Sequence, residues 1–241
     1  MQVQMVGATD IGHCRKSNQD SLFYDQIQGI GIVADGVGGR PGGDVASYMA
    51  VNGIRNAFIN CEKIRHEEIH PFLVNTIDSI NKEVIEKGRD GYTGMGTTLN
   101  CLVFLGDKLH IAHIGDSRTY LYYQRHLWQL TSDHNLKTFL ARGWLLPPHV
   151  PSNLKETRLL RAVGFDERCE VDIYEKIIKD GDIYITATDG FFDMVDDKQI
   201  TQIIDQNSHR YEKLPALLIE EANKRGGRDN ITVLLSKVVR T

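Results

Sequence analysis

Short runs of apolar and β-branched residues recur along the whole chain and are typical of β-strands. Glycine, asparagine and aspartate lie between many of these runs, and they favour turns. We expect strands at residues 21–24, 29–34, 98–104, 109–114, 119–123, 169–174, 182–188 and 231–239. The tripeptide Gly106-Asp107-Lys108 separates two of the runs and predicts a hairpin.

Helical periodicity interrupts the strands early and late in the chain. Residues 43–59 carry the first helical pattern, and residues 197–206 and 211–225 carry two late ones. Another helix is predicted to begin at Pro71, to stop at Gly88 and to bury a stripe of Leu73, Ile77, Ile80 and Val84. Helix pairs around groups of strands predict an α+β fold, in which sheets pack on each other with helices outside.

The composition is that of an ordinary soluble protein, and the chain is long enough for one large domain or two small ones. The chain has 241 residues, of which 41% are hydrophobic and 25% charged, and its formal net charge is −4. We interpret residues 1–241 as a single domain and the less regular residues 135–164 as a flap. No Lys/Arg-rich run is present, so we expect no nucleic-acid binding. No apolar run approaches the ~20 residues of a membrane span, so we expect no membrane insertion.

The first residues and the cysteines bear on the cellular compartment. The first residues lack a basic start followed by an apolar stretch, so we expect a cytoplasmic protein. The cysteines are widely spaced without a Cys-x-x-Cys motif, which favours reduced thiols; they are Cys14, Cys61, Cys101 and Cys169. We also expect a monomer.

Three aspartates at the ends of predicted strands are the strongest chemical signal. Asp35 and Asp189 each follow an apolar run, and Asp229 stands just ahead of another. Glycines accompany all three, and they let the backbone approach a ligand closely. Carboxylate oxygens in such a setting favour Mg²⁺ or Mn²⁺ over zinc. Metal-assisted hydrolysis is therefore the first hypothesis.

Two other motifs suggest different chemistry. His66-Glu67-Glu68-Ile69-His70 matches the His-Glu-x-x-His pattern of zinc peptidases, which needs both histidines on one helical face. Pro71 follows at once, and a residue before proline disfavours the helical conformation. A zinc peptidase acting through His66 and His70 is thus an alternative that requires a continuous helix through Pro71. Ser117 follows Gly115-Asp116, but a nucleophile elbow would need glycine where Thr119 stands.

Eight short blocks follow one another between about residues 7 and 238. They are Thr9-Asp10-Ile11-Gly12-x-x-Arg15-x-x-Asn18-Gln19-Asp20, Asp35-Gly36-Val37-Gly38-Gly39, Gly96-Thr97-Thr98, Gly115-Asp116-Ser117-Arg118-x-Tyr120, Leu130-Thr131-x-Asp133-His134, Leu160-Arg161-Ala162-Val163-Gly164, Thr188-Asp189-Gly190 and Gly227-Arg228-Asp229-Asn230-Ile231-Thr232-Val233. Each block alone is weak, but the ordered set is specific. On these residues the chain resembles the metal-dependent protein phosphatases of type 2C, the PPM family, in its bacterial form.

The resemblance implies a fold and a metal centre. The fold would be an antiparallel β-sandwich flanked by helix pairs on both faces, in α-β-β-α layers. The enzyme would hydrolyse phosphoserine and phosphothreonine in proteins by direct attack of a water that bridges two Mn²⁺ or Mg²⁺ ions. Asp35 would bridge the ions, the carbonyl of Gly36 would bind one, and Asp189 and Asp229 would complete the other. Bacterial relatives often hold a third, weaker ion, which here would lie between Asp116 and Asp189.

The resemblance also implies supporting roles and partners. Arg15 would pair with the substrate phosphate, Asp20 would hold metal-bound water, and Asn230 would support the ligands from behind. A Ser/Thr protein kinase would be the natural counterpart, and the kinase's targets would be the substrates. A non-catalytic binding module with the same fold is the alternative, although it has no need to retain Arg15 together with four aspartates.

The chain departs from the family at two positions. Val37 stands where eukaryotic relatives carry a histidine proposed as general acid, so the leaving oxygen would take its proton from water or a metal-bound water. Arg40 stands where bacterial relatives often carry histidine, which either alters substrate contacts or is neutral. The flap at residues 135–164 either biases substrate choice or is a passive loop.

Overall fold

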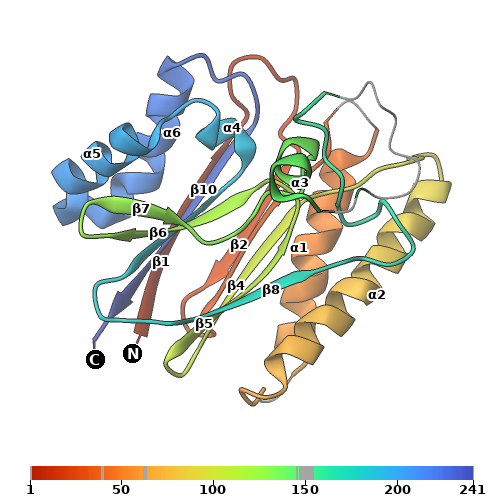
Figure 1. Cartoon of the computed structure of the whole chain (residues 1–241), viewed down its shortest axis with the longest axis horizontal. Helices are drawn as coiled ribbons and strands as arrows, with labels where there is room; N and C mark the ends of the chain where they lie inside the picture. Colours follow the sequence, from red (N-terminus) through yellow and green to blue (C-terminus); the bar gives the residue numbers. More distant parts are fainter. Residues whose placement is uncertain (1, 39–40, 62–63, 145, 147–154, 241) are drawn as a thin grey trace.

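The computed structural model describes residues 2–38, 41–61, 64–144, 146 and 155–240. These residues form two five-stranded sheets that pack face to face (Figure 1). Every pair of neighbouring strands among them is antiparallel. The first sheet has the order β1-β10-β9-β6-β7, and the second has the order β2-β3-β4-β5-β8.

The strands of the first sheet come from both ends and the middle of the chain: β1 (Gln2–Asp10), β6 (Arg118–Tyr123), β7 (His126–Gln129), β9 (Ile183–Ala187) and β10 (Ile231–Val239). The second sheet is more local in sequence: β2 (Asp20–Asp25), β3 (Ile30–Asp35), β4 (Leu99–Leu105), β5 (Lys108–Ile114) and β8 (Asp172–Ile177). Gly106 and Asp107 join β4 to β5 in a two-residue turn, which confirms the predicted hairpin.

Helices cover the outer face of each sheet. The second sheet is covered by α1 (Gly43–Ile59) and α2 (Ile69–Arg89), which appear on the right in Figure 1. The first sheet is covered by α4 (Asp189–Phe192), α5 (Asp197–Asn207) and α6 (Leu214–Lys224), on the left. A further short helix, α3 (Leu136–Arg142), belongs to neither layer. The α+β prediction with α-β-β-α layers is therefore confirmed.

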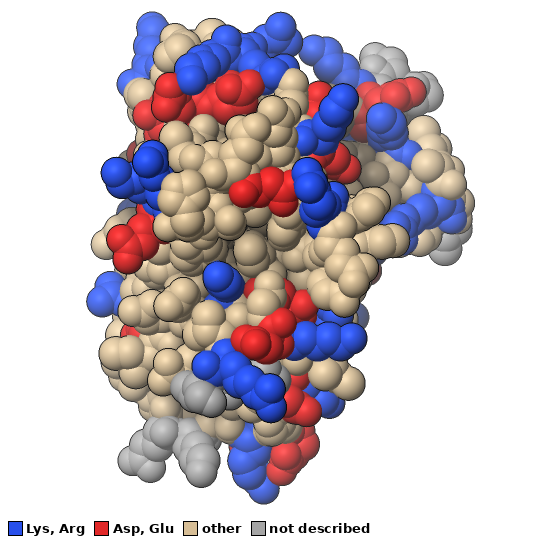
Figure 2. All heavy atoms as spheres, turned by 90° about the vertical axis from the view of Figure 1, so that its left-hand side faces the viewer, with Lys and Arg blue, Asp and Glu red and all other residues tan. Residues whose placement is uncertain are grey.

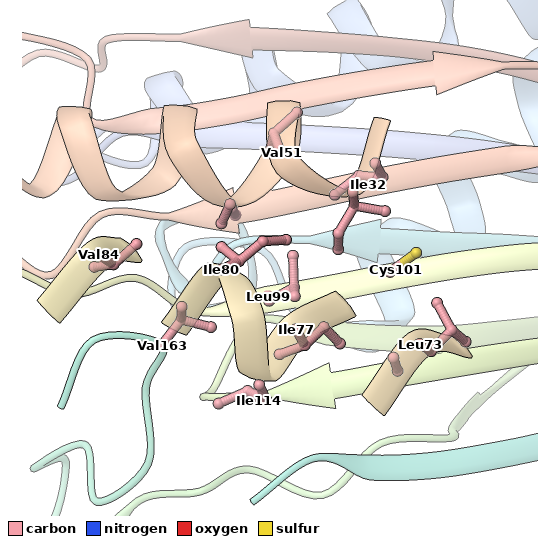
Figure 3. Close-up of a cluster of buried hydrophobic side chains, with 14 of the residues drawn as sticks. Ile32, Val51, Leu73, Ile77, Ile80, Val84, Leu99, Cys101, Ile114 and Val163 are labelled. Atoms are coloured by element: carbon pink, nitrogen blue, oxygen red, sulfur yellow. The ribbon is translucent and has the colours of Figure 1, made fainter. Parts of the chain in front are cut away.

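Alternation along the strands explains why both faces of a sheet are apolar. In β5, Ala112 and Ile114 face α1 and α2, whereas Leu109 and Ile111 face the other sheet. Figure 3 shows the outer cluster, in which Leu73 and Ile77 of α2 lie over this sheet. Both side chains are fully buried. Truncation of such a residue to alanine costs about 2–5 kcal/mol, so this cluster is a principal anchor of α2.

The predicted limits of α2 are wrong at both ends. The helix begins at Ile69, which places Pro71 in its third position rather than its first. Proline is tolerated there because the first four N–H groups of a helix have no partner within it. Gly88 lies inside the helix, and the first glycine with positive φ beyond it is Gly91 at 108°.

Other differences from the predicted elements lie where local patterns are ambiguous. No element was predicted from the sequence at β1, β7, α3 or α4, and β8 was predicted about three residues too early. The last predicted helix is divided into a 3₁₀ turn, η1 (Ser208–Lys213), and α6. Pro215 explains the division, because its ring favours the first turn of a new helix.

The outer face of α5 and α6 carries both signs of charge. Figure 2 shows basic and acidic side chains intermingled over this side of the molecule. On α6, Lys224 pairs with Glu220 at 2.6 Å and Arg225 pairs with Glu221 at 2.8 Å. Among the described residues, no helix is both long and apolar enough to cross a bilayer.

Candidate active site

Five aspartates singled out from the sequence meet at one end of the sandwich, and together they are called the aspartate cluster. Asp20 begins β2 and Asp35 ends β3, and the two are directly opposite partners in the sheet. Asp116 follows β5, Asp189 opens α4, and Asp229 precedes β10. A cavity of about 630 Å³ is lined by four of them, Asp35, Asp116, Asp189 and Asp229.

Crowding changes the acidity of these groups. Burial raises the pKa of Asp35 well above its usual range, and repulsion by Asp20 and Asp189 raises it further. Burial is also the main reason why the pKa rises to about 7 for Asp20, about 6 for Asp189 and about 8 for Asp116. Negative neighbours add to each of these shifts. The aspartates therefore oppose one another's ionisation, and a positive charge among them would relieve that repulsion.

Two threonine hydroxyls fix the carboxyl group of Asp20. Thr188 Oγ1 donates to Asp20 Oδ2 over 3.0 Å, and Thr232 Oγ1 donates to the same oxygen over 2.6 Å. Among the described residues, Asp20 Oδ1 is buried without any hydrogen-bond partner. A buried carboxyl oxygen without a donor is costly unless water or a cation approaches it. The sequence analysis did not assign a role to either threonine, because their contact with Asp20 spans more than 160 residues.

Two glycines bring backbone close to the cluster. A Cβ atom on Gly36 would lie 2.2 Å from the carbonyl oxygen of Gly43, and one on Gly190 would lie 2.1 Å from that of Asn230. Neither position can therefore hold a larger residue without displacement of backbone. Since Gly36 follows Asp35 and lines the cavity, its own carbonyl is available as an additional oxygen donor near the carboxylates.

Arg15 reaches the same cavity from the loop between β1 and β2. Its Nη2 pairs with Asp229 Oδ2 at 2.5 Å, and its side chain is 39% exposed. The contact with Asp229 is the main cause that raises the pKa of the guanidinium. The structure thus brings together the residue expected to bind phosphate and one of the residues expected to bind metal.

Asn230 holds the loop that carries Arg15. Its Nδ2 donates to the carbonyl oxygens of Ile11 at 2.9 Å and Ser17 at 3.0 Å. Its Oδ1 accepts from the backbone N–H of Gln19 at 2.8 Å. Asn230 is 4% exposed, and both polar atoms of its side chain bind this loop. It therefore helps to position Arg15 without facing the cavity.

Comparison with known proteins identifies the family. The profile of protein phosphatase 2C matches residues 12–214. The serine/threonine phosphatase stp of Listeria monocytogenes is 37% identical over 234 residues, which cover 94% of this chain and 92% of that protein. The chain belongs to the protein phosphatase 2C family.

Solved structures of family members agree with this placement. The S. agalactiae serine/threonine phosphatase is 30% identical and superposes with a TM-score of 0.87, over 98% of this chain and 99% of that one. The catalytic domain of the serine/threonine protein phosphatase PstP, solved in complex with two manganese ions, is 28% identical with a TM-score of 0.84, over 99% of both chains. The antiparallel sandwich described above is thus the fold of protein phosphatase 2C.

A second cavity extends from the phosphatase site. It has a volume of about 920 Å³ and shares Asp116 and Asp189 with the first cavity. Arg118 and Asp133 lie in its wall and form a bidentate ion pair whose Nη2–Oδ2 distance is 2.7 Å. Asp116 and Asp189, the residues predicted to hold a third ion, therefore lie in the wall shared by the two cavities.

Two further candidates from the sequence, Ser117 and the His66/His70 pair, do not form the sites expected of them. Ser117 is fully buried, and its Oγ is 2.7 Å from Thr98 Oγ1, so it is not available as a nucleophile. His66 precedes the first residue of α2, whereas His70 lies within the helix. The helical pair required by a zinc peptidase is therefore absent, and Glu67 forms an exposed ion pair with Arg65 at 3.3 Å.

The predicted flap borders the cavity where the structure describes it. Four residues of the predicted flap line the cavity: Lys155, Thr157, Arg158 and Leu159. Arg40 and residues 147–154, which include the three flap prolines, lie outside the described residues. Val37 lines the cavity next to Gly36 and provides no ionisable group.

Proposed function

We propose that this chain hydrolyses phosphoserine and phosphothreonine in proteins, with two Mn²⁺ or Mg²⁺ ions held by the aspartate cluster. The observation that carries the proposal is the group of mutually repelling aspartates around one cavity, with Arg15 at its edge. Membership in the protein phosphatase 2C family supports the same reaction.

The donors suit a hard divalent cation. Carboxylate and carbonyl oxygens are the ligands that Mg²⁺ and Mn²⁺ prefer. Three features of the cavity fit such an ion: the raised pKa values, the unpartnered Oδ1 of Asp20 and the close backbone approach at Gly36. The PstP structure with two manganese ions supports the same ion type and number. We propose Asp35, Gly36, Asp189 and Asp229 as the ligands of two ions, and Asp116 with Asp189 as the site of a third.

The ions, when bound, would supply a water of lowered pKa and positive charge next to the phosphoryl oxygens. The chain itself supplies orientation. Asp20, fixed through Oδ2 by Thr188 and Thr232, keeps Oδ1 as an acceptor that can orient a water proton. Val37 offers no acid, so the leaving serine or threonine oxygen takes its proton from water.

Arg15 is proposed to bind the substrate phosphate. A guanidinium matches two phosphate oxygens in a planar, bidentate contact. In the structure Arg15 instead holds Asp229, and the same carboxylate cannot serve a cation and a guanidinium equally well. We therefore propose that Arg15 moves from Asp229 to the phosphate in the loaded enzyme. Anchoring of its loop by Asn230 limits that movement to the side chain.

Substrate choice is assigned to the flap in this proposal. Lys155 and Arg158 add positive charge to the cavity wall, which suits a phosphorylated segment. The partners would be phosphoproteins and the Ser/Thr kinase that modifies them, in the cytoplasm, with the phosphatase as a monomer of one domain. Free cysteines at all four cysteine positions, each of which the structure describes, support a reducing compartment.

The test is hydrolysis of a phosphothreonine peptide with Mn²⁺, with excess chelator, and by Asp35→Asn in Mn²⁺. Activity should require both the ion and Asp35. Asp90→Asn is the matched control, because Asp90 is an exposed carboxylate at the end of α2. Equal turnover in chelator and in Mn²⁺ would contradict the metal mechanism. An inactive parent that still binds phosphoprotein would favour the non-catalytic module.

A further inference from the structure

A second group of metal-type ligands lies away from the aspartate cluster. His70 on α2, His110 on β5 and Glu175 on β8 bring their side-chain donors together over the outer face of the second sheet. His110 and Glu175 are directly opposite partners of neighbouring strands. Asp116 follows the end of β5, and strand geometry places Ile114, the last residue of β5, about 13 Å from His110. Figure 1 shows the first turns of α2 at the lower edge of the molecule, far from α3 and α4 at the top.

The spacing of the three donor atoms suits one ion. His70 Nε2 is 3.1 Å from His110 Nδ1, and Glu175 Oε2 is 3.7 Å from His110 Nδ1 and 3.9 Å from His70 Nε2. The two longer distances exceed a hydrogen bond. A point equidistant from all three atoms lies about 2.1 Å from each, which matches zinc–nitrogen and zinc–carboxylate bond lengths.

The surroundings keep the donors in place. His110 is 1% exposed because its side chain is on the same face of β5 as Ala112, under α2. Its Nε2 is buried and has no hydrogen-bond partner among the described residues, so its polar contacts are all on the Nδ1 side. Lys108 Nζ holds Oε1 of Glu175 at 2.6 Å, which leaves Oε2 for the histidines.

The charge state of His110 also suits a metal. Burial lowers the pKa of His110, and the nearby His70 and His66 lower it further. A neutral imidazole is the form that binds metal ions. His66 lies next to this group, against the β4–β5 turn, with its ring centroid 6.2 Å from that of His110.

We propose that His70, His110 and Glu175, called the histidine cluster, bind one Zn²⁺ ion. Two imidazoles and one carboxylate form a donor set that favours zinc over the Mg²⁺ or Mn²⁺ expected at the aspartates. A water completes the coordination, since the side chains of His70 and Glu175 are 45% and 40% exposed. The ion fastens the start of α2 to β5 and β8, and it joins three segments that are distant in sequence. Its role is structural, because the cluster lies far from the cavity that holds the substrate.

Zinc binding is measured in the 241-residue chain carrying Asp35→Asn, so that the aspartate cluster is weakened and turnover plays no part in the readout. The protein is stripped with chelator and titrated with Zn²⁺ against a chromophoric competitor. One Zn²⁺ per chain should bind, and His70→Ala or Glu175→Gln should weaken its affinity about 100-fold, as expected when one of few ligands is lost. Co²⁺ should give the intense visible absorption of a four-coordinate site in the parent and lose it in both variants.

The controls separate the site from general effects. His126→Ala removes an exposed histidine of β7 and should leave zinc affinity unchanged. His70 and Glu175 are partly exposed, and circular dichroism of each variant before titration establishes that it is folded. Undetectable zinc binding by the folded parent, or equal affinity in the parent and both variants, would overturn the proposal and leave an ordinary histidine–histidine hydrogen bond. A failed phosphatase assay has no bearing on either outcome.

Discussion

The aspartate cluster and the histidine cluster are linked through β5, which carries His110 and is followed by Asp116, but they differ in almost every physical respect. The aspartates stand on loops and strand ends around a cavity, where five carboxyl groups repel one another. The histidines lie on a strand and a helix, where His70 Nε2 and His110 Nδ1 share a hydrogen bond of 3.1 Å. The aspartate cluster therefore needs a positive charge to relieve the repulsion among its carboxylates, whereas the histidine cluster has no such repulsion. The comparison shows that donor chemistry, more than position in the fold, decides which ion a site can take.

The largest effect expected at either cluster is that of Asp35→Asn. Loss of the proposed bridging carboxylate should lower kcat/KM for a phosphothreonine peptide by about 10³-fold or more, on the scale of lost electrostatic stabilisation in other active sites. Zinc binding at the histidine cluster should be unchanged. Steady-state kinetics and zinc titration of the same preparation measure both quantities. Parallel loss of zinc and activity would show that the two clusters are coupled.

Arg15→Ala should have the next largest effect. Loss of a bidentate phosphate contact should lower kcat/KM by about 100-fold, and Arg15→Lys should recover only part of it because an ammonium lacks the planar fork. The same variants leave Asp229 without its partner, so Mn²⁺ affinity should rise or stay constant. Kinetics at saturating Mn²⁺ separate the two effects. Arg168→Ala, which removes an exposed arginine, is the control, and an equal loss there would argue against a specific phosphate contact.

The stability of the metal-free protein should depend on pH in a direction set by the aspartates. Their folded pKa values, about 6 to 8 for Asp189, Asp20 and Asp116, exceed the ordinary 3.8. The folded state therefore binds more protons than the unfolded state between about pH 4 and 8, so the free energy of unfolding falls as pH rises through this range. The fall should be on the order of a few kcal/mol in chelator and much smaller in Mn²⁺.

Urea denaturation at pH 5 and pH 8, with and without Mn²⁺, measures this dependence. The histidine cluster provides the contrast, because zinc bound there should raise stability at pH 8 without removing the pH dependence. If the metal-free protein were more stable at pH 8 than at pH 5, the aspartates would not be the repelling group described here.

The layers of the fold could be predicted from local sequence patterns, but several helices and strands could not. Apolar stripes predicted α1 and α5 nearly at their observed bounds, and α2 with errors of two residues or fewer at each end, because those helices bury one face against a sheet. The strand β1 was missed even though it pairs with β10 along its whole length, since that pairing joins opposite ends of the chain. The single-domain interpretation and the role of the flap stay predictions.

The two clusters also differed in how far they could be predicted, because only the histidine cluster depends entirely on contacts between distant parts of the chain. Asp35, Asp189 and Asp229 were visible because glycine and apolar runs lie beside each of them, whereas Asp20 and Asp116 were predicted only from the family resemblance. The histidine cluster could not be predicted, because His70 meets His110 and Glu175 only after α2 packs on the sheet. The zinc-peptidase alternative required His66 and His70 on one helix, and His66 lies outside α2. Thr188 and Thr232 were likewise recognisable only from their contacts with Asp20.

Thr232→Val tests the smallest of these contributions, the hydroxyl support of Asp20. The change keeps the shape of the side chain but removes the 2.6 Å hydrogen bond to Oδ2. Thr186→Val is the matched control, since it removes a buried hydroxyl that is 3.0 Å from Thr119 Oγ1 and does not contact Asp20. Each change should cost about 1 kcal/mol of stability. Only Thr232→Val should also lower kcat, by about 3- to 10-fold, because a misoriented carboxylate holds water less well. Equal kcat values in the two variants would mean that the sheet alone positions Asp20. The threonine hydroxyl would then contribute to stability but not to turnover.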